Sequence, residues 1–108
     1  MSSKDAKQEL ISFLERRAFQ PVLRARASEY PENKRDELAD LQERTRREIE
    51  RFHNYRSAED VVTNFKRDLH SSKAKEIHER LERLNLPTIN DVRQEFEELA
   101  DRLGVTDR

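Results

Sequence analysis

Apolar residues recur along this chain every three or four positions, the spacing that places them on one face of a helix. The pattern is clearest near the end of the chain, where steps of three and four alternate strictly. The apolar residues there are Ile89, Val92, Phe96, Leu99 and Leu103. Thr88 followed by Asp91 is typical of a capped helix start, and Gly104 of a helix stop. We therefore expect a last helix over about residues 88–103.

A long segment that begins at Pro31 carries a narrower apolar stripe. Pro31 suits the first position of a helix and Glu32 its positive end, and the helix is expected to run to about Tyr55. So sparse a stripe is closer to a coiled-coil seam than to the face of a globular helix. We expect it, together with the seam of the last helix, to carry association with another chain. The expected intermolecular residues are Leu38, Leu41, Ile49, Phe52 and Tyr55.

The first part of the chain also predicts helix, with one interruption. Ser2 or Ser3 can accept hydrogen bonds from the free N–H groups of a first turn. Pro21 lacks an N–H group and its ring clashes with the preceding turn, so we expect a kink or restart near residues 19–20.

A further helix start is predicted at Ser57, which is followed by an acid three residues later. Between Leu69 and Ala74 the spacing of apolar residues slips, and His70-Ser71-Ser72 lies in the slip. This segment is either a bend or the start of a separate helix capped by Ser71 or Ser72. The sequence leaves open whether residues 57–85 form one helix or two.

These elements predict an all-α protein, with one domain over residues 1–108. The expected architecture is an elongated antiparallel bundle of three or four helices, with a kink or break near Pro21 and another possible near His70–Ser72. The composition agrees, because the chain has one Gly, 42% charged residues and 33% hydrophobic residues. So thin a bundle is expected to leave little room for a pocket of roughly 300 Å³.

Composition also excludes two kinds of chemical site. There is no Cys, which removes thiolate sites, and the single Gly excludes a glycine-rich phosphate loop. We expect neither an enzyme nor a cofactor, and no small-molecule substrate is evident. The chain has no stretch of about 20 apolar residues and no secretory signal, so a cytoplasmic location away from membranes is the default expectation.

Charge is unevenly distributed although the net charge is only −1. Residues 91–101 are acidic, whereas residues 16–28 contain no acid. Three interpretations stay open: the two segments pair within one bundle, they pair between subunits, or the basic segment binds an anionic partner. The basic candidates for an anion-binding patch are Arg16, Arg17, Arg24 and Arg26.

Acid-to-arginine pairs four residues apart are typical of a solvated helix face. Five pairs have the favourable order: Asp40–Arg44, Glu43–Arg47, Glu76–Arg80, Glu79–Arg83 and Glu98–Arg102.

The sequence contains partial patterns for two binding chemistries, nucleic acid and metal. Residues 74–103 can be drawn as helix, turn, helix, but the second helix is acidic and would repel phosphates, which argues against nucleic acid. Glu50 and His53 lie one helical step apart, yet a di-iron bundle needs two such steps. We therefore assign no metal site.

His70-Ser71-Ser72-Lys73-Ala74 resembles the phosphoacceptor segment of histidine phosphotransfer domains, which are helical bundles of similar length. Ala74 stands where those domains usually have Gly, and Ser72 where they have Leu. The resemblance implies that His70 would carry the phosphoryl group and that Lys73 would balance its charge. It supplies the alternative to our leading hypothesis. That hypothesis is a non-enzymatic helical module that acts by binding another protein or by binding itself as a homodimer.

Overall fold

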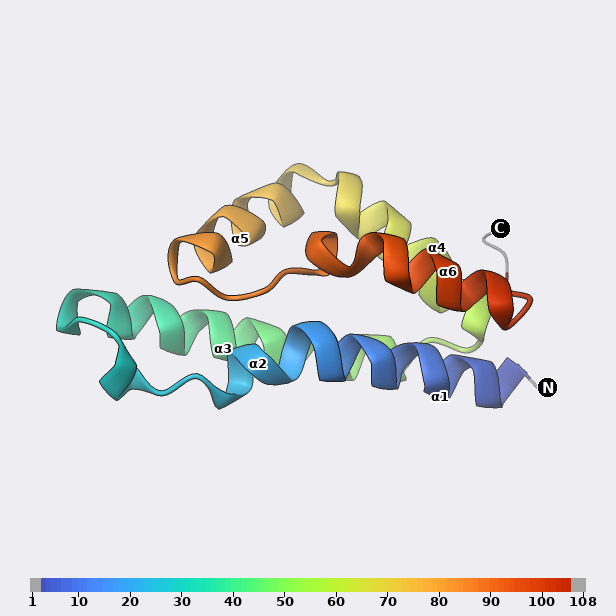
Figure 1. Cartoon of the computed structure of the whole chain (residues 1–108), viewed down its shortest axis with the longest axis horizontal. Helices are drawn as coiled ribbons and strands as arrows, with labels where there is room; N and C mark the ends of the chain where they lie inside the picture. Colours follow the sequence, from blue (N-terminus) through green and yellow to red (C-terminus); the bar gives the residue numbers. More distant parts are fainter. Residues whose placement is uncertain (1–2, 106–108) are drawn as a thin grey trace.

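The computed structural model describes residues 3–105, and these form helices and connecting turns without a strand. The all-α prediction is therefore confirmed. The molecule is elongated, with extents of 47 × 24 × 21 Å. Figure 1 shows two layers of helices: α1, α2 and α3 form one layer, and α4, α5 and α6 form the other.

The first layer begins with a helical rod. The rod comprises α1 (Ser3–Leu14), a π-turn (Glu15–Phe19) and α2 (Gln20–Arg24). The interruption predicted near Pro21 takes the form of this π-turn rather than of a break, and the Gln20 N–H donates to the Glu15 carbonyl five residues earlier. The wider turn accommodates the proline, because it moves the preceding carbonyls away from the ring.

The long helix α3 (Glu32–His53) runs back along this rod in the opposite direction (Figure 1). A 3-10 turn (Ala27–Glu29) comes before it. The Gln42 side chain of α3 donates to the carbonyls of Val22 and Ala25, at 3.1 and 2.8 Å. These carbonyls lie at the end of α2, so Gln42 stabilises the end of one helix from the middle of another.

The second layer contains α4 (Ala58–His70), α5 (Ser72–Arg83), a 3-10 turn (Ile89–Val92) and α6 (Arg93–Arg102). Residues 57–85 form two helices, because Ser71 adopts an extended conformation and its hydroxyl accepts a hydrogen bond from the Ala74 N–H. Ser57 caps α4 and Thr88 caps the 3-10 turn as predicted. Gly104 ends the last helix with a φ of 71°.

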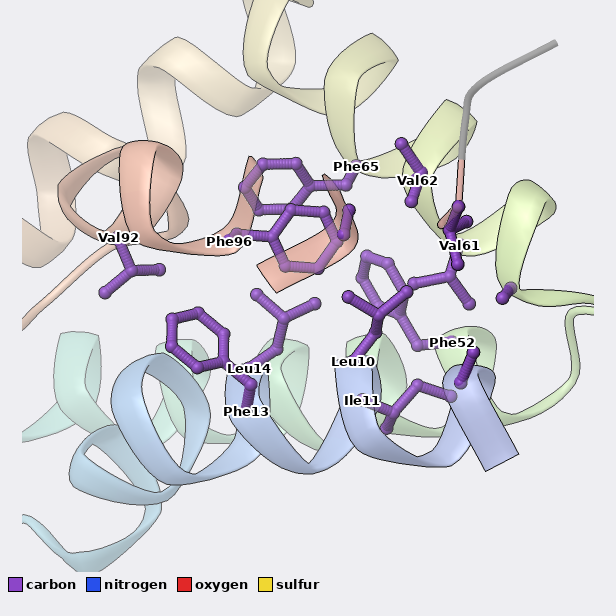
Figure 2. Close-up of a cluster of buried hydrophobic side chains, with 14 of the residues drawn as sticks. Leu10, Ile11, Phe13, Leu14, Phe52, Val61, Val62, Phe65, Val92 and Phe96 are labelled. Carbon is purple, nitrogen blue, oxygen red and sulfur yellow. The ribbon is translucent and has the colours of Figure 1, made fainter. Parts of the chain in front are cut away.

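Two apolar clusters hold the layers together. The larger one joins α1, the end of α3, α4 and α6, and Figure 2 shows its side chains meeting between α1 and the second layer. Phe65 of α4 stacks on Phe96 of α6 with ring centroids 4.0 Å apart. The smaller cluster joins α2, the first half of α3 and the end of α5, and is formed by Val22, Leu38, Leu41, Leu81, Leu84 and Leu86.

The two clusters contain the α3 residues that the sequence predicted to contact another chain. Leu38, Leu41 and Phe52 are at most 1% exposed within the single chain. Ile49 and Tyr55 are partly buried and pack against the larger cluster. A role for the three buried residues in binding a second chain is inconsistent with that burial. The first half of the α3 stripe packs against α2 and α5, and its second half packs against α1 and α4.

None of the described helices combines the length and the hydrophobicity that crossing a bilayer requires.

Candidate functional site

A groove lies between α3 and α5, with a volume of about 380 Å³. The backbones of α3 and α5 do not pack closely, in contrast to those of α1 and α4. Figure 1 shows α5 and the linker that follows it above α3. The prediction that the bundle is too thin for such a pocket is wrong, because the break at Ser71 and the linker around Pro87 hold α5 away from α3.

Ion pairs join α3 to neighbouring helices near both ends of this groove. At one end Arg80 of α5 donates from Nε to Glu37 at 3.2 Å and from Nη2 to Asp40 at 2.8 Å. At the other end Arg51 of α3 donates to Asp68 of α4. The groove therefore has fixed ends, and along α3 it extends over about 15 Å, the length of roughly ten helical residues.

The interior surface of the groove is mainly apolar. Its floor comes from Ala18, Phe19 and Val22 of the π-turn and α2. Thr45 also faces the groove, but its hydroxyl donates to the Leu41 carbonyl at 2.8 Å and so is already satisfied. The apolar wall residues are Leu41, Ala74, Ile77, Leu81 and Ile89.

Cations dominate the rim. Four basic side chains line the groove, Arg44, Arg47, Arg51 and Lys73, against two carboxylates, those of Glu48 and Asp68. Both carboxylates accept hydrogen bonds from the same guanidinium, that of Arg51. The other cations therefore receive no neutralising charge from the carboxylates of the lining.

Arg51 is held firmly by its surroundings. Its guanidinium lies 5.4 Å from the ring centroid of Phe52 and 5.9 Å from that of Tyr55. Burial alone would lower the pKa of Arg51, but its hydrogen bonds to Asp68 and Glu48 hold the pKa above the ordinary value. The side chain therefore stays charged, and it forms a fixed polar end wall.

His78 lines the groove from α5. Burial lowers the pKa of its imidazole below the ordinary 6.5, although the nearby charges of Glu82 and Asp91 act in the opposite direction. The imidazole is therefore neutral near pH 7 and adds no charge to the lining.

The structure does not provide the geometry that the resemblance to histidine phosphotransfer domains implies. His70 is the last residue of α4, and Lys73 lies in the first turn of α5. Ser71 between them has a ψ of 147°, so the two side chains do not share one helix face. Lys73 lines the groove instead, whereas His70 is exposed outside it.

The basic segment divides into two parts. Arg17 forms a bidentate pair with Glu95 of α6, at 2.5 and 3.0 Å, which confirms pairing between the basic and acidic segments within one bundle. Arg16, Arg24 and Arg26 are exposed, and their guanidinium groups form no ion pair with a carboxylate within residues 3–105. They do not line the groove, so the basic segment and the cationic rim are separate surfaces.

The Glu50–His53 step does not form a ligand set. Nε2 of His53 lies 2.6 Å from Oε1 of Glu15, and Glu50 is exposed. Across the described part of the chain, no group of three or more histidines and acids lies close enough together to hold a metal ion.

No known family model, curated protein or solved structure matches this chain.

The sequence did not predict the groove because its walls come from four separate segments, and their pairing depends on tertiary packing. The slip in apolar spacing at His70–Ser72 was the one sequence signal related to the groove, because it marks the break between α4 and α5.

Proposed function

We propose that the protein is a non-enzymatic interaction module that binds an apolar side chain of another protein in the groove between α3 and α5. The observation that carries this proposal is the groove itself, an apolar pocket of about 380 Å³ with fixed ends and a charged rim. That volume lies within the range of roughly 300–1,000 Å³ that ligand sites occupy. An aromatic or aliphatic anchor inside an apolar pocket is the usual centre of a binding interface.

Two further features support binding rather than catalysis. The polar side chains with fixed geometry, Arg51 and Arg80, are engaged in ion pairs at the ends of the groove. The hydroxyl of Thr45 is engaged with its own helix, and no described hydrogen bond joins the imidazole of His78 to a hydroxyl of the lining. The lining thus offers surface and charge, but it lacks a nucleophile hydrogen-bonded to a base.

A selection from a random-peptide library tests this function. The wild-type protein is compared with Ala74→Phe, in which an aromatic ring occupies the groove, and with Ala39→Phe, which adds the same ring at an exposed position of α3 outside it. We expect enriched peptides to bind the wild type and Ala39→Phe, and to lose affinity for Ala74→Phe. Ile77→Glu, which introduces charge into the same wall, should reproduce that loss.

Circular dichroism establishes that each variant is folded before binding is compared. Absence of enriched peptides would overturn the proposed function. Peptides that bind Ala74→Phe and Ile77→Glu as tightly as the wild type would also overturn it, because their site would lie elsewhere.

A further inference from the structure

The cations on the rim of the α3–α5 groove come from opposite walls. Arg44 and Arg47 belong to α3 and Lys73 belongs to α5. Arg44 donates to Asp40 at 3.1 Å, so its charge is partly balanced. Among the cations of this rim, Arg47 and Lys73 are the two that carboxylates of the chain balance least.

Lys73 forms no ion pair with any carboxylate in residues 3–105. Arg47 lies 3.6 Å from Glu43, but its side chain is 73% exposed, and so open an ion pair contributes little. A ligand carboxylate could displace this weak pairing at low cost. Both walls of the groove therefore present a cation that is available to a negatively charged partner.

We propose that the groove recognises an acidic peptide segment, in which an apolar side chain enters the pocket and flanking carboxylates pair with Arg47 and Lys73. This inference rests on the proposed function and adds the chemistry of the partner. The apolar floor selects the anchor, while the two cations select the charge and the orientation of the segment around it.

The two cations are needed together with the apolar floor to define this partner. Phosphate groups alone would pair with the cations but would leave the apolar surface of Phe19, Val22 and Ile77 uncovered. A neutral apolar segment would use the floor but leave the cations without partners. An acidic segment with a large apolar residue satisfies both, and its affinity should fall as salt screens the exposed pairs.

The test uses the same random-peptide library and a charge-reversed variant, Arg47→Glu with Lys73→Glu. The control is Arg16→Glu with Arg24→Glu, which makes the same change of charge at exposed positions outside the groove. We expect peptides enriched on the wild type to have a net negative charge. Their dissociation constant should rise by at least about tenfold on the charge-reversed variant. It should stay within about twofold on the control, where the lost charges are remote and screened.

Other outcomes would overturn this inference in recognisable ways. Enriched peptides that depend on the groove but are neutral or basic would overturn the acidic partner and leave the proposed function intact. Loss of binding in the Arg16 and Arg24 control, but not in the charge-reversed variant, would assign recognition to the basic segment.

Two outcomes would indicate a different occupant of the groove. Binding of dodecanoate in the groove without enrichment of any acidic peptide would indicate a lipid ligand. Self-association that Ala74→Phe abolishes would indicate a second copy of the chain. Absence of groove-dependent peptides would overturn both proposals.

Discussion

Arg80 of α5 donates a hydrogen bond from Nη2 to Oδ2 of Asp40 on α3 over 2.8 Å. The hydrogen bond from Arg80 is the main cause of the lowered pKa of the Asp40 carboxyl, and the hydrogen bond from Arg44 adds to it. The bond to Asp40 in turn raises the pKa of Arg80. This contact fixes α5 to α3 at the surface, in addition to the leucines of the smaller apolar cluster that join the two helices.

Removal of this contact should loosen α5 specifically. We expect Arg80→Met to lower the free energy of unfolding by about 1 kcal/mol, because the partly buried Arg80 side chain bonds two carboxylates. Arg44→Met removes an exposed pair within one helix and should cost at most about 0.5 kcal/mol. Urea unfolding measures both values, and an equal effect of the two substitutions would contradict the role given to Arg80.

The lowered pKa of His78 predicts a dependence of stability on pH. The unfolded chain binds a proton at His78 more readily than the folded one, so stability is greatest above the ordinary pKa of 6.5 and falls as the pH drops below it. We expect urea unfolding to show this loss between about pH 7 and pH 5. His78→Gln should reduce the slope, whereas an unchanged slope would show that other groups cause it.

The end of α5 depends on a residue in the left-handed region. Asn85 has a φ of 58°, and the N–H of Leu86 returns to the Leu81 carbonyl at 2.9 Å. Side chains branched at Cβ are strained in this conformation, so Asn85→Val should lower stability by about 1–2 kcal/mol. Asn85→Gly should preserve or raise it. Thermal unfolding distinguishes them, and a Val variant as stable as the Gly variant would contradict the assigned conformation.

The burial of the α3 seam predicts a monomer. Leu38, Leu41 and Phe52 are three of the four large apolar residues of that helix, and all three lie inside the chain's own core. Sedimentation equilibrium at high micromolar concentration should therefore give the mass of one chain. A dimer that persists on dilution would show that another surface, still to be found, carries association.

The helix boundaries were largely predictable from the sequence because they are encoded locally. Ser57, Thr88 and Gly104 act through hydrogen bonds or backbone conformations within a few residues, and each is found where the sequence placed it. The π-turn before Pro21 is a local feature whose exact form the sequence did not indicate, since a kink and a wider turn both relieve the proline ring.

The groove was not predictable from local patterns. Its existence depends on how far α5 stands from α3, which several tertiary contacts set together. Arg80 illustrates the difficulty: the sequence paired it with Glu76 on its own helix, but the structure pairs it with Glu37 and Asp40 on α3. Periodicity likewise identified the α3 seam correctly as apolar but could not show that α2, α5, α1 and α4 cover it.

The central claim is that the α3–α5 groove is where this protein binds. Its most direct test is an amide chemical-shift map of the labelled protein titrated with a library-selected peptide. We predict that the largest shifts fall on Thr45, Arg47, Lys73, Ala74 and Ile77. Shifts confined to residues 16–17 and 24–26, or spread over the acidic face of α6, would contradict the claim.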